Sequence, residues 1–312
     1  MPRAHKRRVG LTFPPSFHLG VQLATTRASW QEIQDAARRV EALGYDSVWV
    51  PDHLVSREAA ADRLEAWQLL AAIAASTRRI RVGPLVSPVT FRHPAVLAKM
   101  AATVDHVSDG RLILGLGAGG LPIEHEMFGI AFGPRSERIE RLDEACVVVR
   151  SMFDDPQPAF VGRHYQLRDA IAEPKPTQRH LPLLIGGGSP LVVGIAARHA
   201  DMWNMIATPD LFAPAVAGLR SRLDAVGRER AAVAATVSFR AVIRATPTAI
   251  ATRIAQLDPV WRDDPYRLTG DAVDGRRRIG AYAEADADGV ILQMPAPYDF
   301  ETLASLVAIV RT

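Results

Sequence analysis

The stretch SWQEIQDAARRVEALGYDSVWVPDH, residues 29–53, predicts one helix followed by one buried strand. Ser29 and Glu32 have the spacing of a capping box, which begins a helix. Apolar residues then recur on one face of that helix at Trp30, Ile33, Ala37, Val40 and Leu43. Gly44 can take the left-handed conformation that ends a helix. The run 45–50 is apolar enough to be a strand covered on both faces, as in parallel sheets.

The same alternation of strand and helix continues in both directions from this stretch. Strands are predicted at 19–23, 45–50, 80–86, 111–116, 182–185, 202–206, 237–245 and 289–293. Further helices are predicted at 64–76, 94–106, 134–153, 190–199, 209–226, 247–257 and 301–310. About eight strands, each followed by a helix, favour a (β/α)8 TIM barrel over an open doubly wound sheet.

The chain is longer than such a barrel requires. A (β/α)8 barrel usually needs ~250 residues, whereas this chain has 312, so we expect loop insertions at the C-terminal face of the strands. The segments 119–133, 154–180 and 258–274 are the candidates, and 160–167 is predicted to be a small hairpin around Gly162.

The distribution of charged residues divides the chain into two parts. Four basic residues lie among the first eight, and the rest of the chain carries 33 Lys and Arg against 34 Asp and Glu. We therefore expect a basic, disordered arm over 1–16 and a single, nearly neutral domain over 17–312. A body without a basic excess does not predict nucleic-acid binding.

The compartment is predicted from what the N-terminus and the cysteine content allow. Residues 9–17 are too short for an export signal and are interrupted by Pro14 and Pro15, and no run approaches the ~20 apolar residues of a membrane helix. The single cysteine, Cys146, lies in an amphipathic run and is expected to be a small core residue. These features predict a cytoplasmic protein that does not enter a membrane.

Residues directly after the strands are the candidates for chemistry, because the active site of a barrel is built at the carboxyl ends of its strands. Asp52 and His53 follow the second predicted strand. A carboxylate beside an imidazole suits proton transfer near neutral pH. The alternative is a helix-capping Asp with a structural His.

Two glycine-rich loops follow later strands. GLGAGG at 115–120 matches the dinucleotide fingerprint, but no helix-compatible sequence follows it, so its small residues are expected only to allow close approach to a flat ligand. GGGSP at 186–190 opens a helix with unpaired N–H groups, which predicts a phosphate cradle; a tight turn with an ordinary Ser cap is the alternative. Glu124, His125 and Glu126 lack the spacing of a metal motif, and no metal is expected.

Taken together, the motifs resemble the luciferase-like monooxygenase superfamily, in particular its oxidoreductases that use the deazaflavin coenzyme F420. The motifs are LGYDSVWVPDH (43–53), FRHPA (91–95), SDGRLILGLGAG (108–119), EHEMFG (124–129), RIERLDE (138–144), GGGS (186–189) and ADMWN (200–204). The resemblance is good over residues 17–207 and looser beyond.

The resemblance implies site residues. Asp52 and His53 would lie near the cofactor ring, with His53 as the catalytic proton-transfer residue. A bulge with a non-prolyl cis peptide, which backs the ring in this family, maps near Leu85 and Val86. Gly117, Ala118 and Gly119 would line the ribityl chain. Gly187, Gly188 and Ser189 would bind its phosphate.

Two positions depart from the family pattern. Gly120 stands where this branch often has Trp and where the sugar-phosphate dehydrogenases have a proton-donating Glu, which disfavours sugar-phosphate oxidation. The helix after Ser189 has no cation before Arg198, which weakens the expected phosphate contact.

The function that the resemblance implies is hydride transfer between coenzyme F420 and a small organic substrate. An FMN-dependent monooxygenase that uses O2 is the alternative, and a cofactor-binding homologue without turnover is a third reading. A homodimer is the assembly that is common in such a family.

Overall fold

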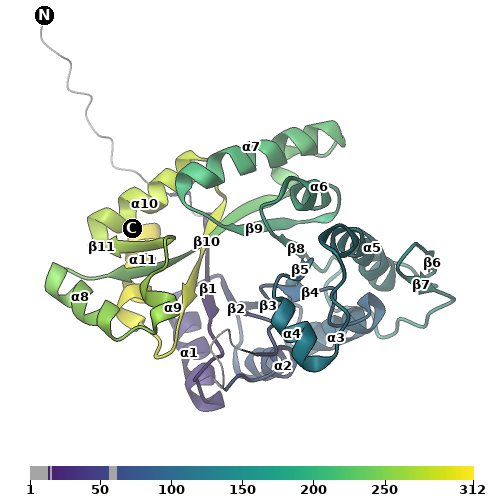
Figure 1. Ribbon diagram of the computed structural model, residues 1–312, viewed down its shortest axis with the longest axis horizontal. Helices are drawn as coiled ribbons and strands as arrows, with labels where there is room; N and C mark the ends of the chain where they lie inside the picture. Colours follow the sequence, from purple (N-terminus) through teal and green to yellow (C-terminus); the bar gives the residue numbers. More distant parts are fainter. Residues whose placement is uncertain (1–12, 15, 56–61) are drawn as a thin grey trace, which may run out of the picture.

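The computed structural model describes residues 13–14, 16–55 and 62–312. Most of the predicted N-terminal arm, 1–16, lies outside the described residues. The described chain forms a nearly closed parallel barrel surrounded by helices, so the predicted (β/α)8 TIM barrel is confirmed (Figure 1).

The barrel wall follows a simple order. Its strands are β1 (His18–Leu23), β2 (Ser47–Val50), β3 (Arg81–Pro84), β4 (Ser87–Pro88), β5 (Leu114–Gly117), β8 (Leu183–Gly186), β9 (Met202–Ile206), β10 (Ala234–Ile243) and β12 (Gly289–Met294). The hydrogen-bonded order is β3-β2-β1-β12-β10-β9-β8-β5-β4. Since β3 and β4 occupy one position, interrupted by a bulge, the described residues give eight strand positions. A bridge between Val82 and Leu112 joins the two edges.

The helices cover the outside of this wall. They are α1 (Trp30–Leu43), α2 (Ala66–Ser76), α3 (Pro94–Val107), α4 (Pro122–Phe128), α5 (Arg135–Asp154), α6 (Pro190–His199), α7 (Pro209–Ala225), α8 (Pro247–Ala255), α9 (Pro259–Arg262), α10 (Ala272–Glu284) and α11 (Phe300–Arg311), with a short 3-10 turn at Arg230–Ala232.

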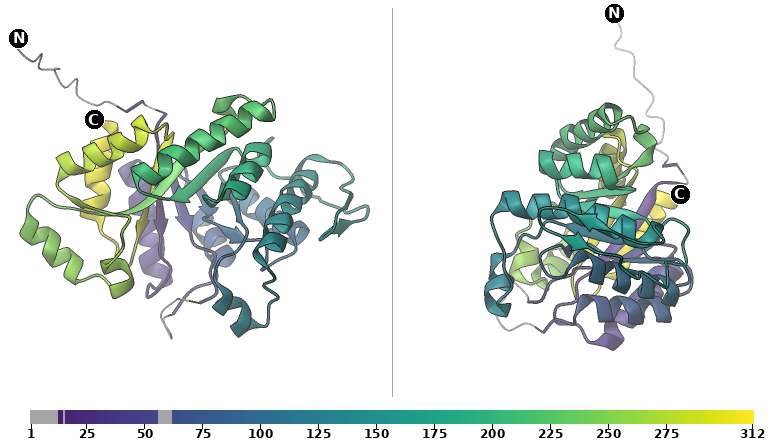
Figure 2. Two further views of the ribbon diagram at one scale, coloured as in Figure 1. Left: turned by 45° about the horizontal axis from the view of Figure 1, so that its top comes forward. Right: turned by 90° about the vertical axis from the view of Figure 1, so that its right-hand side faces the viewer.

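The first predicted unit is confirmed in detail. The Ser29 and Glu32 side chains form the reciprocal capping box, and Gly44 ends α1 at φ 89°. Ile33, Ala37 and Val40 are buried against the barrel. The hairpin is also confirmed, as β6 (Phe160–Val161) pairs antiparallel with β7 (Gln166–Leu167). It lies at the opposite end of the molecule from α8 (Figure 2, left).

The sequence prediction was wrong in two of the insertions. Residues 119–133 contain the helix α4, which Pro122 begins at its N1 or N2 position. Residues 258–274 contain α9, β11 (Arg267–Gly270) and the start of α10, a helix that the prediction missed. Its capping box uses Asp271 and Asp274 rather than the usual Ser and Glu. The predicted helix after the seventh strand, α8, therefore belongs to an insertion, and β11 pairs with the outer half of β10.

Strand boundaries differ less. The predicted strand 80–86 ends early, because β3 stops at Pro84. The cis Leu85–Val86 peptide lies in the bulge that follows, and β4 begins after it at Ser87, beyond the predicted bounds. Cys146 is fully buried on α5, as predicted, and burial raises the pKa of its thiol to about 12.

Of the described helices, none combines the length and the apolar composition that crossing a bilayer requires.

Candidate functional site

A cavity of about 1360 Å³ opens at the carboxyl ends of the barrel strands. Nine of the ten predicted site residues line it, and they come from four loops that are distant in sequence. These residues are His53, Leu85, Val86, Gly117, Ala118, Gly119, Gly187, Gly188 and Ser189. The barrel therefore brings the predicted residues to one place.

Asp52 is the exception. Its side chain is buried and lies behind the cavity wall, where it accepts hydrogen bonds from Ser87 Oγ (2.6 Å) and Arg92 Nη1 (2.7 Å). Asp52 is not the N-cap residue of any described helix, and it is not among the residues that line the cavity, so its predicted cofactor contact stays a prediction. Asp52 instead joins the end of β2 to β4 and to the loop before α3, so it positions the backbone that carries His53.

His53 forms a dyad with a carboxylate that the sequence prediction did not assign. Its Nδ1 lies 2.9 Å from Glu124 Oε2, and Glu124 is buried on α4 while the imidazole is 43% exposed. The other Glu124 oxygen accepts the backbone N–H groups of Leu54 (2.6 Å) and Val55 (3.2 Å). The EHEMFG motif was the available signal, but nothing in it shows that Glu124 faces a loop 71 residues earlier.

The electrostatics of the dyad keep Glu124 ionised. Burial alone would raise the pKa of its carboxyl, but the hydrogen bond and charge of His53 and the two backbone N–H groups outweigh burial, and the pKa is lowered. An anionic Glu124 accepts a hydrogen bond from Nδ1–H of His53. The second ring nitrogen, Nε2, is then the atom of this imidazole that can exchange a proton with a molecule in the cavity.

The glycines of the GLGAGG segment serve the bulge on β3 and β4. A Cβ on Gly115 would lie 2.0 Å from the Pro84 carbonyl oxygen, and one on Gly117 would lie 2.5 Å from Val86 Cγ2. A Cβ on Gly186 would also meet Val86, at 2.8 Å. The close approach made possible by these glycines is thus to the protein's own chain, and it lets Leu85 and Val86 enter the cavity wall.

The segment 186–189 presents an unpaired hydroxyl. Ser189 is the N-cap residue of α6, yet its side chain makes no capping bond, and its buried Oγ has no partner among the described residues. Gly187 adopts φ 130°, a conformation that favours glycine. The first N–H groups of α6 also lack partners within the helix. A buried hydroxyl beside free N–H groups at a helix N-terminus fits a phosphate oxygen.

Two arginines of the neighbouring helix α5 line the same cavity as the start of α6. The two helices lie side by side (Figure 1), and Asp143 of α5 pairs with Arg198 at the end of α6. The same number of residues separates Arg135 from Asp143 as separates Pro190 from Arg198, so Arg135 begins α5 level with the start of α6. Arg135 and Arg138 both line the cavity. The cavity wall thus contains positive charge from α5, although α6 itself has no cation before Arg198.

The segment Glu124 to Glu126 does not form a metal site. Among the described residues, no group of three or more His, Cys, Asp or Glu side chains is placed to bind a metal ion. His125 is buried, its Nε2 lies 2.8 Å from Thr90 Oγ1, and its ring packs between Phe91 and Phe132. His125 therefore anchors α4 to the barrel.

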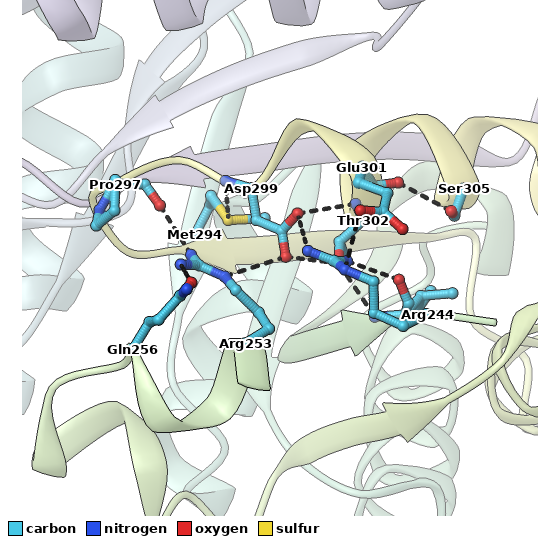
Figure 3. Close-up of polar contacts among 10 residues, drawn as sticks. Arg244, Arg253, Gln256, Met294, Pro297, Asp299, Glu301, Thr302 and Ser305 are labelled. Carbon is cyan, nitrogen blue, oxygen red and sulfur yellow. Dashed lines mark hydrogen bonds and ion pairs between the residues drawn. The ribbon is translucent and has the colours of Figure 1, made fainter. Parts of the chain in front are cut away.

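The far wall of the cavity belongs to the insertion between β10 and α10. Its residues Trp261 and Asp264 line the cavity, with Arg240 paired to Asp264 at 2.9 Å. The base of this insertion is fixed at Asp299, the N-cap of α11 (Figure 3). Asp299 binds Arg244 at 2.8 Å and Arg253 at 3.3 Å. Two arginines on one buried carboxylate connect α8, β10 and α11, so this wall has a defined position.

Comparisons with known proteins agree with this architecture. The chain is 33% identical over 185 residues to an F420-dependent glucose-6-phosphate dehydrogenase of Amycolatopsis mediterranei, covering 59% of this chain and 55% of that protein. It is also 33% identical over 172 residues to the pyrimidine monooxygenase RutA of Cronobacter turicensis, covering 53% and 45% of the two chains. The alignments thus span about half the length of these relatives.

Solved structures share the fold. An F420-dependent secondary alcohol dehydrogenase, solved with an F420-acetone adduct, superposes with a TM-score of 0.80 over 96% of this chain and 99% of its own, at 18% identity. The family model described as luciferase-like monooxygenase matches residues 11–305. With that match over nearly its whole length, the chain belongs to the luciferase-like monooxygenase family.

Proposed function

We propose that this protein is an oxidoreductase that transfers a hydride between the deazaflavin coenzyme F420 and a small organic substrate. The observation that carries the proposal is that one cavity contains both an anion cradle at Ser189 and the His53 imidazole paired with the ionised Glu124. An anionic redox cofactor and a proton-transfer group need these two features in the same space.

The residues present fit such a cofactor. The unpaired Ser189 hydroxyl, the N-terminus of α6 and the guanidinium groups of Arg135 and Arg138 would hold a phosphate. Leu85 and Val86 would support the ring from the bulge, and the 117–119 loop would line the chain that joins ring and phosphate. When bound, the deazaflavin supplies or accepts the hydride.

His53 would move the proton that accompanies the hydride. Its Nδ1 is fixed by Glu124, so Nε2 would hold or release a proton at the substrate. The negative charge of Glu124 would stabilise the imidazolium form during that transfer. Glu124 would stay ionised throughout, because its lowered pKa makes it a poor proton acceptor.

The alternative is a monooxygenase that uses reduced FMN and O2, which the likeness to RutA supports. FMN also carries a ring and a phosphate, so the same cradle would accept it. A homologue without turnover is less compatible with the site, since the His53 and Glu124 dyad is intact and opens into the cavity.

The proposed substrate is not a sugar phosphate. Gly120 lines the cavity, and apart from its own atoms and its two chain neighbours no described heavy atom lies within 4 Å of the position a Cβ would occupy there. Open space thus replaces the acidic side chain expected in a sugar-phosphate oxidising site. Homology to such enzymes supports the cofactor, while this position supports a different small molecule.

Titration of the purified protein with each cofactor, followed by fluorescence quenching, tests the proposal. We expect tight binding of coenzyme F420 and binding of FMN that is weaker by at least about tenfold, a free-energy difference of about 1.4 kcal/mol. Preference for FMN would favour the monooxygenase. Absence of binding by either cofactor would overturn the proposed function.

A further inference from the structure

Two glutamines form a cross-strand pair at the floor of the cavity. Gln22 on β1 and Gln293 on β12 are register partners in the parallel sheet, and both line the cavity. Gln22 is buried, and the dyad and the anion cradle described above use neither side chain.

The orientation of both amides is determined by one carbonyl. Gln22 Nε2 lies 2.6 Å from the carbonyl oxygen of Leu85, and only the NH2 end of an amide can donate to that oxygen. The carbonyl end of Gln22 must then face Gln293, whose Nε2 lies 3.0 Å away and donates to it. Gln293 Oε1 is consequently the one amide atom of this hydrogen-bonded series that still needs a donor.

Gln293 Oε1 is available to accept a hydrogen bond from a bound molecule. Gln293 Oε1 is buried, and no described residue donates to it. Leaving a buried amide oxygen unpaired is costly, so a partner from a bound molecule would recover free energy. A ligand that presents an N–H or O–H donor is favoured here, and one that presents a carbonyl is repelled.

We propose that Gln293 accepts a hydrogen bond from the imide N–H of the cofactor ring, with Gln22 as the residue that positions it. The inference rests on the proposed function, although flavin and deazaflavin rings both carry this imide, so it holds for either cofactor. The cofactor is the favoured source of the donor because the two amides are hydrogen-bonded to the Leu85 carbonyl, and Leu85 lies in the bulge that is expected to support the ring.

The test compares cofactors with and without the donor. Binding of coenzyme F420 and of its N3-methyl derivative is measured for wild type and for Gln293→Met, with FMN and N3-methyl-FMN as a second pair. We expect Gln293→Met to weaken binding of the parent cofactor about tenfold and binding of the methylated one by less than about threefold. Gln22→Met, which frees the Gln293 amide to rotate, should weaken parent binding by about threefold.

Gln166→Met on the exposed hairpin is the matched control, and thermal denaturation of every variant checks folding. Equal weakening of parent and methylated cofactor, or no change in either, would overturn the inference while leaving the proposed function intact. A change only in the substrate KM would assign the donor to the substrate and would overturn it too. If wild type binds neither cofactor, the inference and the proposed function both fail.

Discussion

The chemistry of His53 depends on a residue that it meets only in the folded chain. The imidazole follows β2, whereas Glu124 lies on α4, yet the 2.9 Å contact fixes which ring nitrogen faces the cavity. Asp52, the neighbour of His53 in sequence, turns away to Arg92. Adjacent residues after a strand thus have different roles, because successive side chains of an extended chain point in opposite directions.

Removal of the dyad's charge should reduce turnover without loss of cofactor binding. Glu124→Gln can still accept the Leu54 N–H, but it no longer carries the charge that stabilises a protonated His53. We expect turnover to fall by roughly 100-fold, and His53→Ala to lose most turnover, with cofactor affinity kept within a few fold in both. Steady-state kinetics and quenching titrations measure the two effects.

Glu126→Gln provides the matched control, since Glu126 lies on the same short helix and is exposed. It should retain wild-type turnover. If Glu124→Gln behaves like this control, the dyad has no role in proton transfer. Unchanged turnover in His53→Ala would remove His53 from the mechanism.

At the scale of elements, two helices with the same kind of N-cap residue use it differently. Ser29 caps α1 through a reciprocal box with Glu32, whereas Ser189 begins α6 with an unpaired hydroxyl. The loop before α1 and the Glu32 side chain line the cavity too, but the Ser29 hydroxyl is already bonded to Glu32. Helix α6 begins at the cavity beside the N-terminus of α5, so its free groups are available to a ligand.

This difference predicts opposite effects of the same substitution. Ser29→Ala should reduce the free energy of unfolding by about 1 kcal/mol and leave cofactor binding unchanged. Ser189→Ala should leave stability nearly unchanged, because no capping bond is lost, and should weaken cofactor binding about tenfold. Urea denaturation and quenching titrations compare the two variants. A stability loss in Ser189→Ala equal to that in Ser29→Ala would identify an ordinary cap.

At the scale of the whole molecule, the first and last units of the chain complete the barrel together. Strand β1 pairs with β2 on one side and with β12 on the other. Arg311, on the last helix, donates to the Phe17 carbonyl at 3.0 Å. His18 lies at this junction, with Nε2 2.7 Å from Ser47 Oγ. Burial lowers the pKa of His18 to about 4, with Asp46 opposing the shift and Arg311 and Arg81 adding to it.

The lowered pKa of His18 predicts how stability depends on pH. Between about 4 and 6.5 the unfolded chain binds a proton at His18 that the folded chain does not. The contribution of neutral His18 to the free energy of unfolding is therefore fully present above pH 6.5. It is lost as the pH falls toward 4, by at most about 3 kcal/mol. His18→Gln should flatten this dependence in urea denaturation series, whereas exposed His106→Gln should not. Identical slopes for all three proteins would contradict the assignment.

The sequence by itself determined the barrel, the positions of most strands and helices, and nine residues of the cavity wall. The helices and strands follow from local periodicity and from caps such as Ser29, whereas the residues of the cavity wall follow from motifs that resemble those of the luciferase-like family. Helix α10 was missed because two aspartates form its capping box and its sequence is polar overall, with three consecutive arginines at 276–278. The tertiary structure alone decided that Glu124 meets His53, that two arginines of α5 line the same cavity as the start of α6, and that Gln22 orients Gln293. Each of these is a contact between distant segments, which barrel closure creates and local sequence does not encode.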